Sequence, residues 1–257
     1  CANVTVQNCT FTAHLIYHTI GSAGVDVSMG SYDLRCRRAI NVLYKNCRQT
    51  TDILDTRYWG LFVSDFCKNL TLDGCTFSRF DAHMGVTNAT IRNCTLGHQC
   101  LNAIGHGLLT IENCILYGRN IIALRGDYGS TWNGDAVIRD CIWLPNMARG
   151  AGGRLSLIGG WYTGFHDFGY ECYMPQHVTI DNLVVDDRSH DAEYGGLAIL
   201  GNITPKNSSP EYAPPYPYHV TRSVSVHGLH TTSGLAWRLS DNPYMYRDTV
   251  LTADAEK

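Results

Sequence analysis

Apolar and polar residues alternate in short stretches that recur along the whole chain. Alternation with a period of two predicts a β-strand with one buried face. The eight stretches are VTVQNCTF (4–11), VLYKNCRQ (42–49), LTLDGCTF (70–77), ATIRNCTL (89–96), LTIENCIL (109–116), AVIRDCIW (136–143), VTIDNLVV (178–185) and VSVHGLHT (224–231). Corresponding positions lie between 19 residues (Cys75 to Cys94) and 46 residues (Leu183 to Leu229) apart. A constant unit with insertions of variable length predicts a solenoid whose loops grow on one side.

One position in every stretch is occupied by Asn, Asp or Gly. These positions are Asn8, Asn46, Gly74, Asn93, Asn113, Asp140, Asn182 and Gly228. Asn, Asp and Gly tolerate a left-handed backbone at the least cost. The pattern therefore predicts a one-residue bend at the same place in every coil.

The next position of each stretch is Cys or Leu. These residues are Cys9, Cys47, Cys75, Cys94, Cys114, Cys141, Leu183 and Leu229. A position that accepts either residue is a packing position, because a free cysteine behaves as a small buried apolar group. The chain has eleven cysteines and no CxxC pair. We expect these six thiols to form a reduced internal stack, neither disulfides nor metal ligands.

A strand, a sharp bend, a second strand and a longer turn, repeated at a minimum of about 20 residues, are typical of a parallel β-helix. Over nearly all of residues 3–231 the sequence resembles the right-handed pectin-lyase-like β-helix superfamily, which has an asparagine ladder at its short turn. The resemblance implies an all-β, right-handed parallel β-helix of about eight coils over residues 1–231. The pattern is lost after residue 231, so we expect 232–257 to cap the stack, and earlier coils to precede Cys1. An all-β sandwich would not explain a bend residue that recurs in every stretch.

The third strand of each coil is predicted just before the next stretch, as in DAHMGV (81–86), LNAIGH (101–106) and IIALRG (121–126). Aligning these strands predicts the inward columns Met84, Ile104, Leu124 and Ala82, Asn102, Ile122, with Asp81, His83 and Arg125 facing outward. The turns that follow lengthen along the chain: 87–88, 105–107, 127–135, 160–176 and 202–219. Such loops would form one wall of a groove. In the resembled superfamily this strand and its flanking turns form the substrate groove.

Three groups of residues near this groove carry candidate chemistry. Asp81 and His83 are two apart on a strand, so they share a face and could act as an acid/base pair or be merely solvated. Arg125 could bind a uronate carboxylate, or it could form an ion pair with Asp127 that holds the loop in place. His106 lies in a GHG element that resembles the Gly-His-Gly of polygalacturonase-like glycoside hydrolases, whose paired aspartates and Arg-Ile-Lys element have no counterpart here. It could contact substrate, or the element could be a tight turn whose histidine points outward.

The loops also supply aromatic and polar residues suited to sugar rings. The candidate substrate-binding residues are Tyr58, Tyr128, Trp132, Trp161, His166, Asp167 and Tyr170. With Asp81 and Asp127 as carboxylates, we expect a polysaccharide-degrading enzyme, with glycoside hydrolysis slightly ahead of β-elimination by a uronate lyase. On this interpretation Asp81→Asn and Asp127→Asn abolish turnover and leave the melting temperature nearly unchanged. The alternative from another class is a non-catalytic β-helix adhesin or phage-type fibre domain.

Composition narrows the possible partners. The net charge is −3 and the pI is about 6.4, which argues against a polyanion-binding surface over the whole chain. No apolar run approaches the roughly 20 residues that span a bilayer, and no signal peptide is visible. We expect a polysaccharide or oligosaccharide ligand, no nucleic acid, no membrane, and a monomer rather than a trimer. No cofactor is expected, although single aspartates from several coils could assemble a Ca²⁺ site. The resemblance implies a secreted or cell-surface location.

Overall fold

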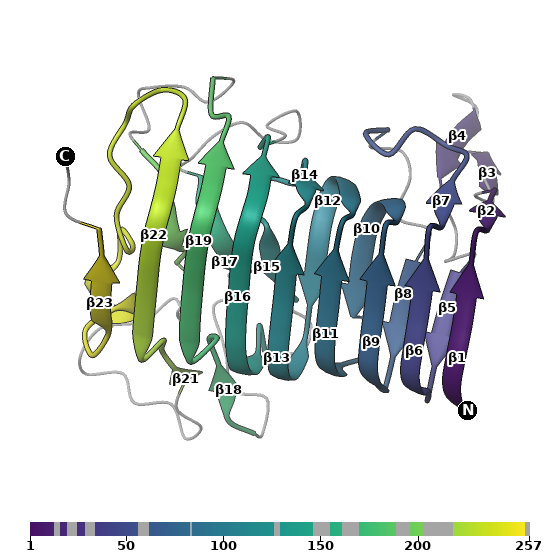
Figure 1. Ribbon diagram of the computed structural model, residues 1–257, viewed down its shortest axis with the longest axis horizontal. Coiled ribbons are helices and arrows are strands. Elements are labelled where there is room, and N and C mark those ends of the chain that lie inside the picture. The colour runs from purple at the N-terminus through teal and green to yellow at the C-terminus, as the bar shows by residue number, and fades with distance from the viewer. Residues whose placement is uncertain are drawn as a thin grey trace.

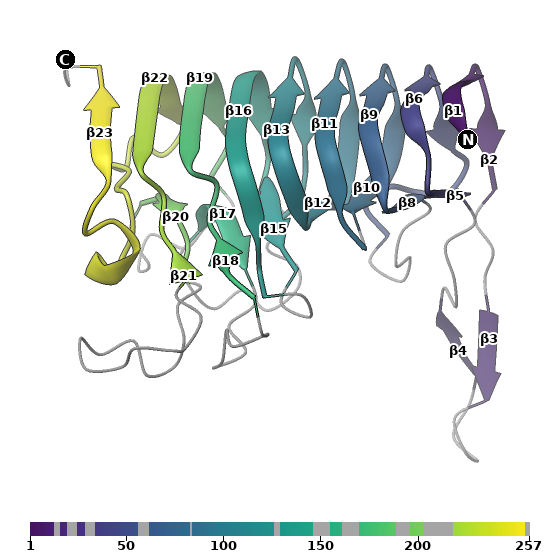
Figure 2. The same cartoon turned by 90° about the horizontal axis from the view of Figure 1, so that it is seen from below.

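The computed structural model describes residues 1–12, 16–19, 25–28, 34–55, 62–82, 84–125, 129–145, 155–160, 170–188, 196–202 and 218–254. The all-β class is confirmed, because most of these residues form parallel strands of one 19-stranded sheet. Each strand pairs with the equivalent strand of the next sequence repeat. The strands therefore stack one after another along the molecule, as in a parallel β-solenoid (Figures 1 and 2). No helix in the described part of the chain has the length and apolar character needed to cross a membrane.

Nine of the described strands form one face of the stack, which we call the long face. In stacking order they are β1 (Ala2–Gln7), β6 (Ile40–Lys45), β9 (Cys67–Asp73), β11 (Val86–Arg92), β13 (Gly105–Glu112), β16 (Trp132–Trp143), β19 (His177–Val185), β22 (Ser223–Thr231) and β23 (Val250–Ala253). They lie side by side in Figure 1. All eight predicted stretches begin within these strands, so the predicted strand positions are confirmed.

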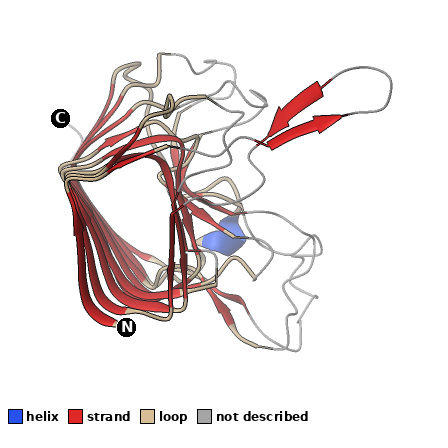
Figure 3. Ribbon diagram, turned by 90° about the vertical axis from the view of Figure 1, so that its right-hand side faces the viewer, coloured by secondary structure: helices blue, strands red, loops and turns tan. Residues whose placement is uncertain are grey.

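Two further groups of strands complete each coil. The second group begins after the bend and contains β2 (Thr10–Phe11), β7 (Arg48–Gln49), β14 (Ile115–Leu116) and the first residues of β10 (Thr76–Ala82) and β12 (Thr95–Ala103). The third group contains the last residues of β10 and β12, with β5 (Leu34–Arg37), β8 (Phe62–Asp65), β15 (Ile122–Leu124), β17 (Ser156–Gly160) and β20 (Ala198–Leu200). Figure 3 looks along the stack and shows successive coils superposed.

Two small sheets lie outside the stack. The hairpin of β3 (Ile16–Thr19) and β4 (Val25–Ser28) is antiparallel and projects away from the coils (Figures 2 and 3). β18 (Cys172–Tyr173) and β21 (Tyr218–His219) form a short parallel pair. A single-turn 3-10 helix, η3 (Pro243–Met245), precedes β23.

The predicted bend column is confirmed. Its φ angles are positive at every member: Asn8 57°, Asn46 52°, Gly74 68°, Asn93 56°, Asn113 50°, Asp140 53°, Asn182 51° and Gly228 64°. The side chains also form a hydrogen-bond ladder, since the Asn113 amide donates to Asn93 at 2.7 Å and the Asn93 amide donates to Asp73 at 2.8 Å. The left-handed backbone and the ladder together explain why Asn dominates this position.

A second asparagine ladder lies at the opposite end of the long face and was not predicted. Asn3, Asn41, Asn69 and Asn88 have φ between 54° and 56°. Each amide donates to the preceding asparagine, at 2.9 Å to Asn3, 2.8 Å to Asn41 and 3.0 Å to Asn69. The sequence signal is an Asn directly before the first apolar residue of four stretches. The long strands are therefore fixed by a ladder at both ends over these coils.

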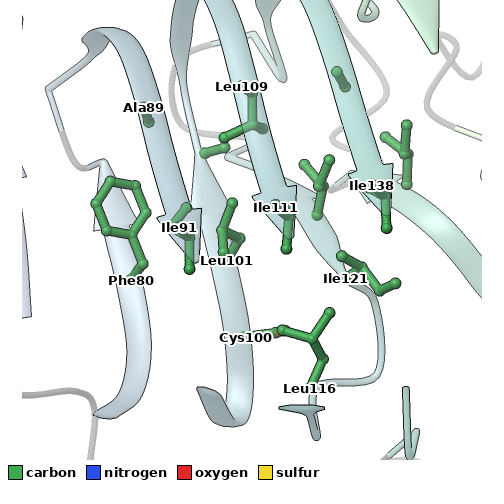
Figure 4. Packing of buried hydrophobic residues seen from close by; sticks show 14 of the residues in the cluster. Phe80, Ala89, Ile91, Cys100, Leu101, Leu109, Ile111, Leu116, Ile121 and Ile138 are labelled. Atoms are coloured by element: carbon green, nitrogen blue, oxygen red, sulfur yellow. The ribbon is translucent and has the colours of Figure 1, made fainter. Parts of the chain in front are cut away.

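The position after the bend packs inside the stack, as predicted. Cys47, Cys75, Cys94, Cys114, Cys141 and Leu183 are buried, whereas Cys9 and Leu229, near the ends, are partly buried. All eleven cysteines are free thiols. Other interior columns hold larger aliphatic side chains, and Figure 4 shows Ile91, Ile111 and Ile138 stacked on successive long strands.

Two buried thiols are expected to make stability fall at alkaline pH. Burial raises the pKa of Cys100 from 9.0 to about 12 and that of Cys172 from 9.0 to about 11. A group whose pKa is raised by folding stabilises the protein below its unfolded pKa, and this contribution is lost as the pH rises through the folded value. We expect urea midpoints to fall progressively above about pH 9, and alkylation of the buried thiols to stay slow until unfolding begins.

Denaturation without reductant should then make most of the thiols available to a thiol reagent. Finding most of them oxidised under those conditions would contradict the buried reduced stack. A Cys100→Ala variant should have a shallower dependence of the urea midpoint on pH, because one titrating buried group is removed.

Relative to β15, the predicted register of the groove strand is wrong by one residue at β12 and by two residues at β10. Asp81 pairs with Asn102 of β12, and Asn102 pairs in turn with Ala123 of β15. Asn102 therefore faces outward, and it is partly exposed. The observed inward columns are Phe80, Leu101, Ile122 and Ala82, Ala103, Leu124. A register irregularity between Phe77 and Arg79 places two extra residues in β12, because Phe77 pairs with Leu96 whereas Arg79 pairs with Cys100. A period of two cannot locate such an insertion, since two residues leave the alternation of inward and outward side chains unchanged.

The sequence after residue 231 continues the parallel pairing. β23 pairs with β22 from Ser223–Val250 to Val226–Ala253, and Arg238 bridges Ala198. Met245 of η3 is fully buried. The division at residue 231 stays a prediction, and the described part of the later segment covers the edge of β22 with one more strand.

Candidate functional site

A buried carboxylate between two arginines lies on the outer side of the third group of strands. The Asp81 side chain on β10 is fully buried and accepts hydrogen bonds from Arg79 and Arg125. The Arg125 Nη1 lies 3.0 Å from Oδ1 and 3.1 Å from Oδ2 of Asp81. Arg125 follows β15, two strands along the stack from β10, so its side chain spans the intervening strand β12. The structure thus brings together Asp81 and Arg125 from the predicted groove.

Amide side chains complete this cluster. The Gln99 carbonyl oxygen accepts a hydrogen bond from Arg79, and a second from the Asn102 amide at 3.3 Å. The Arg79 side chain is 1% exposed and that of Arg125 is 12% exposed. Two guanidinium groups therefore surround one carboxylate, and Arg125 is the member that reaches solvent. With all three groups ionised, the cluster has an excess of one positive charge.

The turn after β15 holds Arg125 in place. Its backbone N–H donates to Ala103 at 3.1 Å, and its carbonyl oxygen accepts from the Ser130 N–H at 2.8 Å. The Ser130 carbonyl oxygen in turn accepts from the Tyr218 hydroxyl at 2.9 Å, and both Ser130 and Tyr218 are buried. The backbone of Arg125 is thus held by hydrogen bonds at both its N–H and its carbonyl oxygen.

The contacts of Asp81 suit positioning better than proton transfer. Both of its oxygens are in hydrogen bonds to guanidinium groups, so an incoming water or sugar would have to displace an arginine to reach them. The side chain is on the outer side of its strand, as predicted, but it is buried and not open to solvent. In this arrangement Asp81 fixes the orientation of Arg125, the more accessible of the two arginines.

His106 lies on the long face, away from its predicted place in a turn. GHG forms the start of β13, where the Nε2 of the exposed His106 is 2.9 Å from the Thr87 hydroxyl. Gly107 has φ +84°, and a Cβ there would lie 2.2 Å from the Asn88 side-chain oxygen. That oxygen accepts the Leu108 N–H at 2.9 Å, so Gly107 takes an asparagine's place at the end of the second ladder. The left-handed backbone and the nearby Asn88 side chain account for Gly107, so this glycine needs no catalytic explanation.

Trp132 is in the core, which corrects its expected place at the surface. Its side chain is 0% exposed, and its Nε1 donates to the Gly107 carbonyl oxygen at 3.0 Å. A buried ring offers no face to a sugar, so we propose no binding role for it. Tyr170, by contrast, is 44% exposed. The other predicted residues lie outside the described residues: Tyr58, His83, Asp127, Tyr128, Trp161, His166 and Asp167.

Comparisons with protein-family models, with curated proteins and with solved structures find no match. Function must therefore be inferred from the geometry of the described residues. Among them, no group of three or more His, Cys, Asp or Glu side chains is arranged to hold a metal ion.

A second polar cluster joins residues that are far apart in the sequence. The Tyr173 hydroxyl donates to the Glu171 carboxylate, and the Tyr173 and His219 rings stack with centroids 4.2 Å apart and planes 9° apart. The His219 Nε2 lies 3.6 Å from the Glu171 carboxylate. Sequence reasoning missed this group because only the pairing of β18 with β21 brings His219 to Tyr173. Carboxylate and aromatic residues in the long loops were the available signal.

Proposed function

We propose that the chain is a right-handed parallel β-helix of the pectin-lyase-like superfamily, with about eight coils, and that it binds and cleaves an acidic polysaccharide. The ligand would lie along the outer side of β10, β12 and β15. The observation that carries this proposal is the partly exposed Arg125 side chain, whose guanidinium contacts the buried Asp81 beside a second arginine. A guanidinium fork binds a carboxylate through two parallel hydrogen bonds, and the local excess of positive charge favours a uronate.

The contacts of Asp81 favour β-elimination over the hydrolysis expected from sequence. Hydrolysis needs two available carboxylates, and both oxygens of Asp81 are already in hydrogen bonds to arginines. In β-elimination a base removes the proton next to the uronate carboxyl. That electron pair forms a C=C bond, and the glycosidic C–O bond breaks with protonation of the leaving oxygen. Arg125 would neutralise the carboxyl group and so stabilise the transient carbanion.

Replacement of Arg125 tests the proposal. We expect Arg125→Gln to weaken binding of acidic oligosaccharides about 10- to 100-fold, the effect of losing a charge-assisted hydrogen bond. Arg125→Lys should keep only part of the wild-type affinity, because the lysine ammonium cannot make the two parallel hydrogen bonds of a guanidinium. Calorimetry would give the affinities. A polysaccharide panel read for both reducing ends and the ultraviolet absorbance of an unsaturated uronate would give the reaction.

Arg139→Gln is the matched control, because Arg139 is an exposed arginine paired with Glu112 on the long face. It should bind like the wild type. If the wild type neither binds nor cleaves any acidic polysaccharide, or if Arg125→Gln behaves like Arg139→Gln, the proposal is wrong.

One observation favours a non-catalytic fibre domain as the second candidate. Ile115, Ile142 and Val184 are in register on successive coils, and they are 40%, 44% and 36% exposed. An exposed apolar column of this kind suits side-by-side association of chains. A trimer by light scattering, without turnover on the polysaccharide panel, would support this candidate, and a monomer that cleaves polysaccharide would eliminate it.

A further inference from the structure

We propose that Glu171, Tyr173 and His219 form a second sugar-binding subsite, which takes an uncharged sugar unit of the polysaccharide whose acidic unit Arg125 binds. This inference rests on the proposed function and adds a ligand class and a direction to it. The polysaccharide would run along the stack, from the arginine cluster towards β18 and β21.

The subsite is built on paired backbone. The Tyr173 N–H donates to the Thr131 hydroxyl at 2.9 Å, and the Met174 N–H donates to the His219 carbonyl oxygen at 2.8 Å. The neighbouring residues Cys172 and Tyr218 are buried in the hydrophobic core. Their burial anchors β18 and β21, so the stacked rings of Tyr173 and His219 are held against a fixed base.

The turns of successive coils connect this cluster to Arg125. Arg125 begins the turn after β15, Tyr173 lies in the turn after β17, and His219 lies in the turn after β20. The bonds from Tyr218 to Ser130 and from Ser130 to Arg125 join these turns directly. β18 contacts β16, the strand that follows the turn after β15. Figure 1 shows β18 and β21 near the starts of β19 and β22.

The spacing suits a short oligosaccharide. Neighbouring strands of a sheet are about 4.8 Å apart. Asp81 is on β10, and the turns that hold Tyr173 and His219 are three and four strands further along the order β10, β12, β15, β17, β20. The two clusters are therefore roughly 14–19 Å apart along the axis. A single sugar cannot contact both, whereas a chain of several sugars can.

The chemistry of the subsite selects an uncharged sugar. The hydrogen bond from Tyr173 lowers the pKa of Glu171, so this residue is a carboxylate at neutral pH. Glu171 is 54% exposed, and its oxygens can accept hydrogen bonds from sugar hydroxyls. The adjacent aromatic rings suit the C–H face of a pyranose. A uronate placed here would bring a second negative charge next to Glu171, which opposes binding.

An oligosaccharide series tests the subsite by calorimetry. The probes are a disaccharide of one galacturonate and one rhamnose, the alternating hexasaccharide of the same two sugars, and an all-galacturonate hexasaccharide. In the wild type we expect the alternating hexasaccharide to bind at least about 10-fold more tightly than the disaccharide, because its second contact is intramolecular. Glu171→Gln should remove most of this gain, leave the disaccharide unchanged, and tighten binding of the all-galacturonate hexasaccharide. Tyr173→Phe should reduce this gain in affinity as well, since it removes the hydroxyl that holds the Glu171 carboxylate in place.

Glu112→Gln is the matched control, because Glu112 is a surface carboxylate paired with Arg139 on the long face. If the cluster is purely structural, Glu171→Gln should change the melting temperature. The variant should then keep the wild-type preference for the alternating hexasaccharide over the all-galacturonate hexasaccharide. If Glu171→Gln and Tyr173→Phe both keep the full length-dependent gain, the subsite is wrong and the role of Arg125 stands. If the wild type binds none of the three probes, the role of Arg125 and the subsite both fail.

Discussion

Asp81→Asn is expected to lower the free energy of unfolding by about 3–5 kcal/mol, the usual cost of breaking a buried ion pair. The replacement removes a fully buried charge and leaves Arg79, whose side chain is 1% exposed, without its carboxylate. At about 2–4 °C per kcal/mol for a domain of this size, the melting temperature should fall by roughly 6–20 °C. Thermal melts followed by circular dichroism would measure it. Reasoning from the sequence predicts the opposite, a variant with nearly wild-type stability and no turnover.

An exposed aspartate on the long face supplies the matched control. Asp135→Asn makes the same chemical change at a solvated position, and we expect an effect within about 0.5 kcal/mol. If Asp81→Asn melts like Asp135→Asn and yet loses all turnover, the carboxylate is a proton-transfer group and the positioning role assigned to it is wrong.

The fold could be predicted because its determinants are local. A bend in the left-handed region needs Asn, Asp or Gly, and an interior position next to it needs a small apolar group. Both requirements recur in every repeat, so positions such as Asn93 and Cys94 identify the coil from sequence alone. The second ladder has the same physical origin. It was missed because Asn88 and its equivalents stand outside the alternating stretch, where an Asn normally indicates a loop.

The candidate site could be predicted only in part, because it depends on register and burial between coils. Placing Asp81 and Arg125 on the outward side of the third strand in different coils needed only the repeat. Whether Asp81 is open or enclosed depends on Arg79, its neighbour two residues earlier, which the alternating pattern assigned no role. The irregularity before Arg79 shifts the pairing of β10 with β12 by two residues, and a shift of two leaves no mark in a pattern of period two.

Trp132→Ala is expected to lower the free energy of unfolding by about 3–5 kcal/mol, as much as Asp81→Asn does. This is the usual cost of truncating a buried aromatic side chain. The indole fills the corner where the turn after β15 enters β16, and its N–H satisfies the Gly107 carbonyl oxygen. Trp132→Phe keeps most of the packing but leaves that oxygen without its donor, so an intermediate loss of about 1–3 kcal/mol is expected. Urea titrations of the three proteins would separate the packing contribution from the hydrogen-bond contribution.

Tyr170→Ala is the matched aromatic control, since Tyr170 is 44% exposed. It should unfold within about 0.5 kcal/mol of the wild type. The two variants also distinguish the two ways in which an aromatic residue in a long loop can matter. A sugar-stacking ring changes affinity and leaves stability intact, whereas a ring that closes the end of a coil changes stability first. If Trp132→Ala keeps wild-type stability and loses only affinity for oligosaccharides, the ring is at the surface in solution, and the corner between β15 and β16 must be open to ligand.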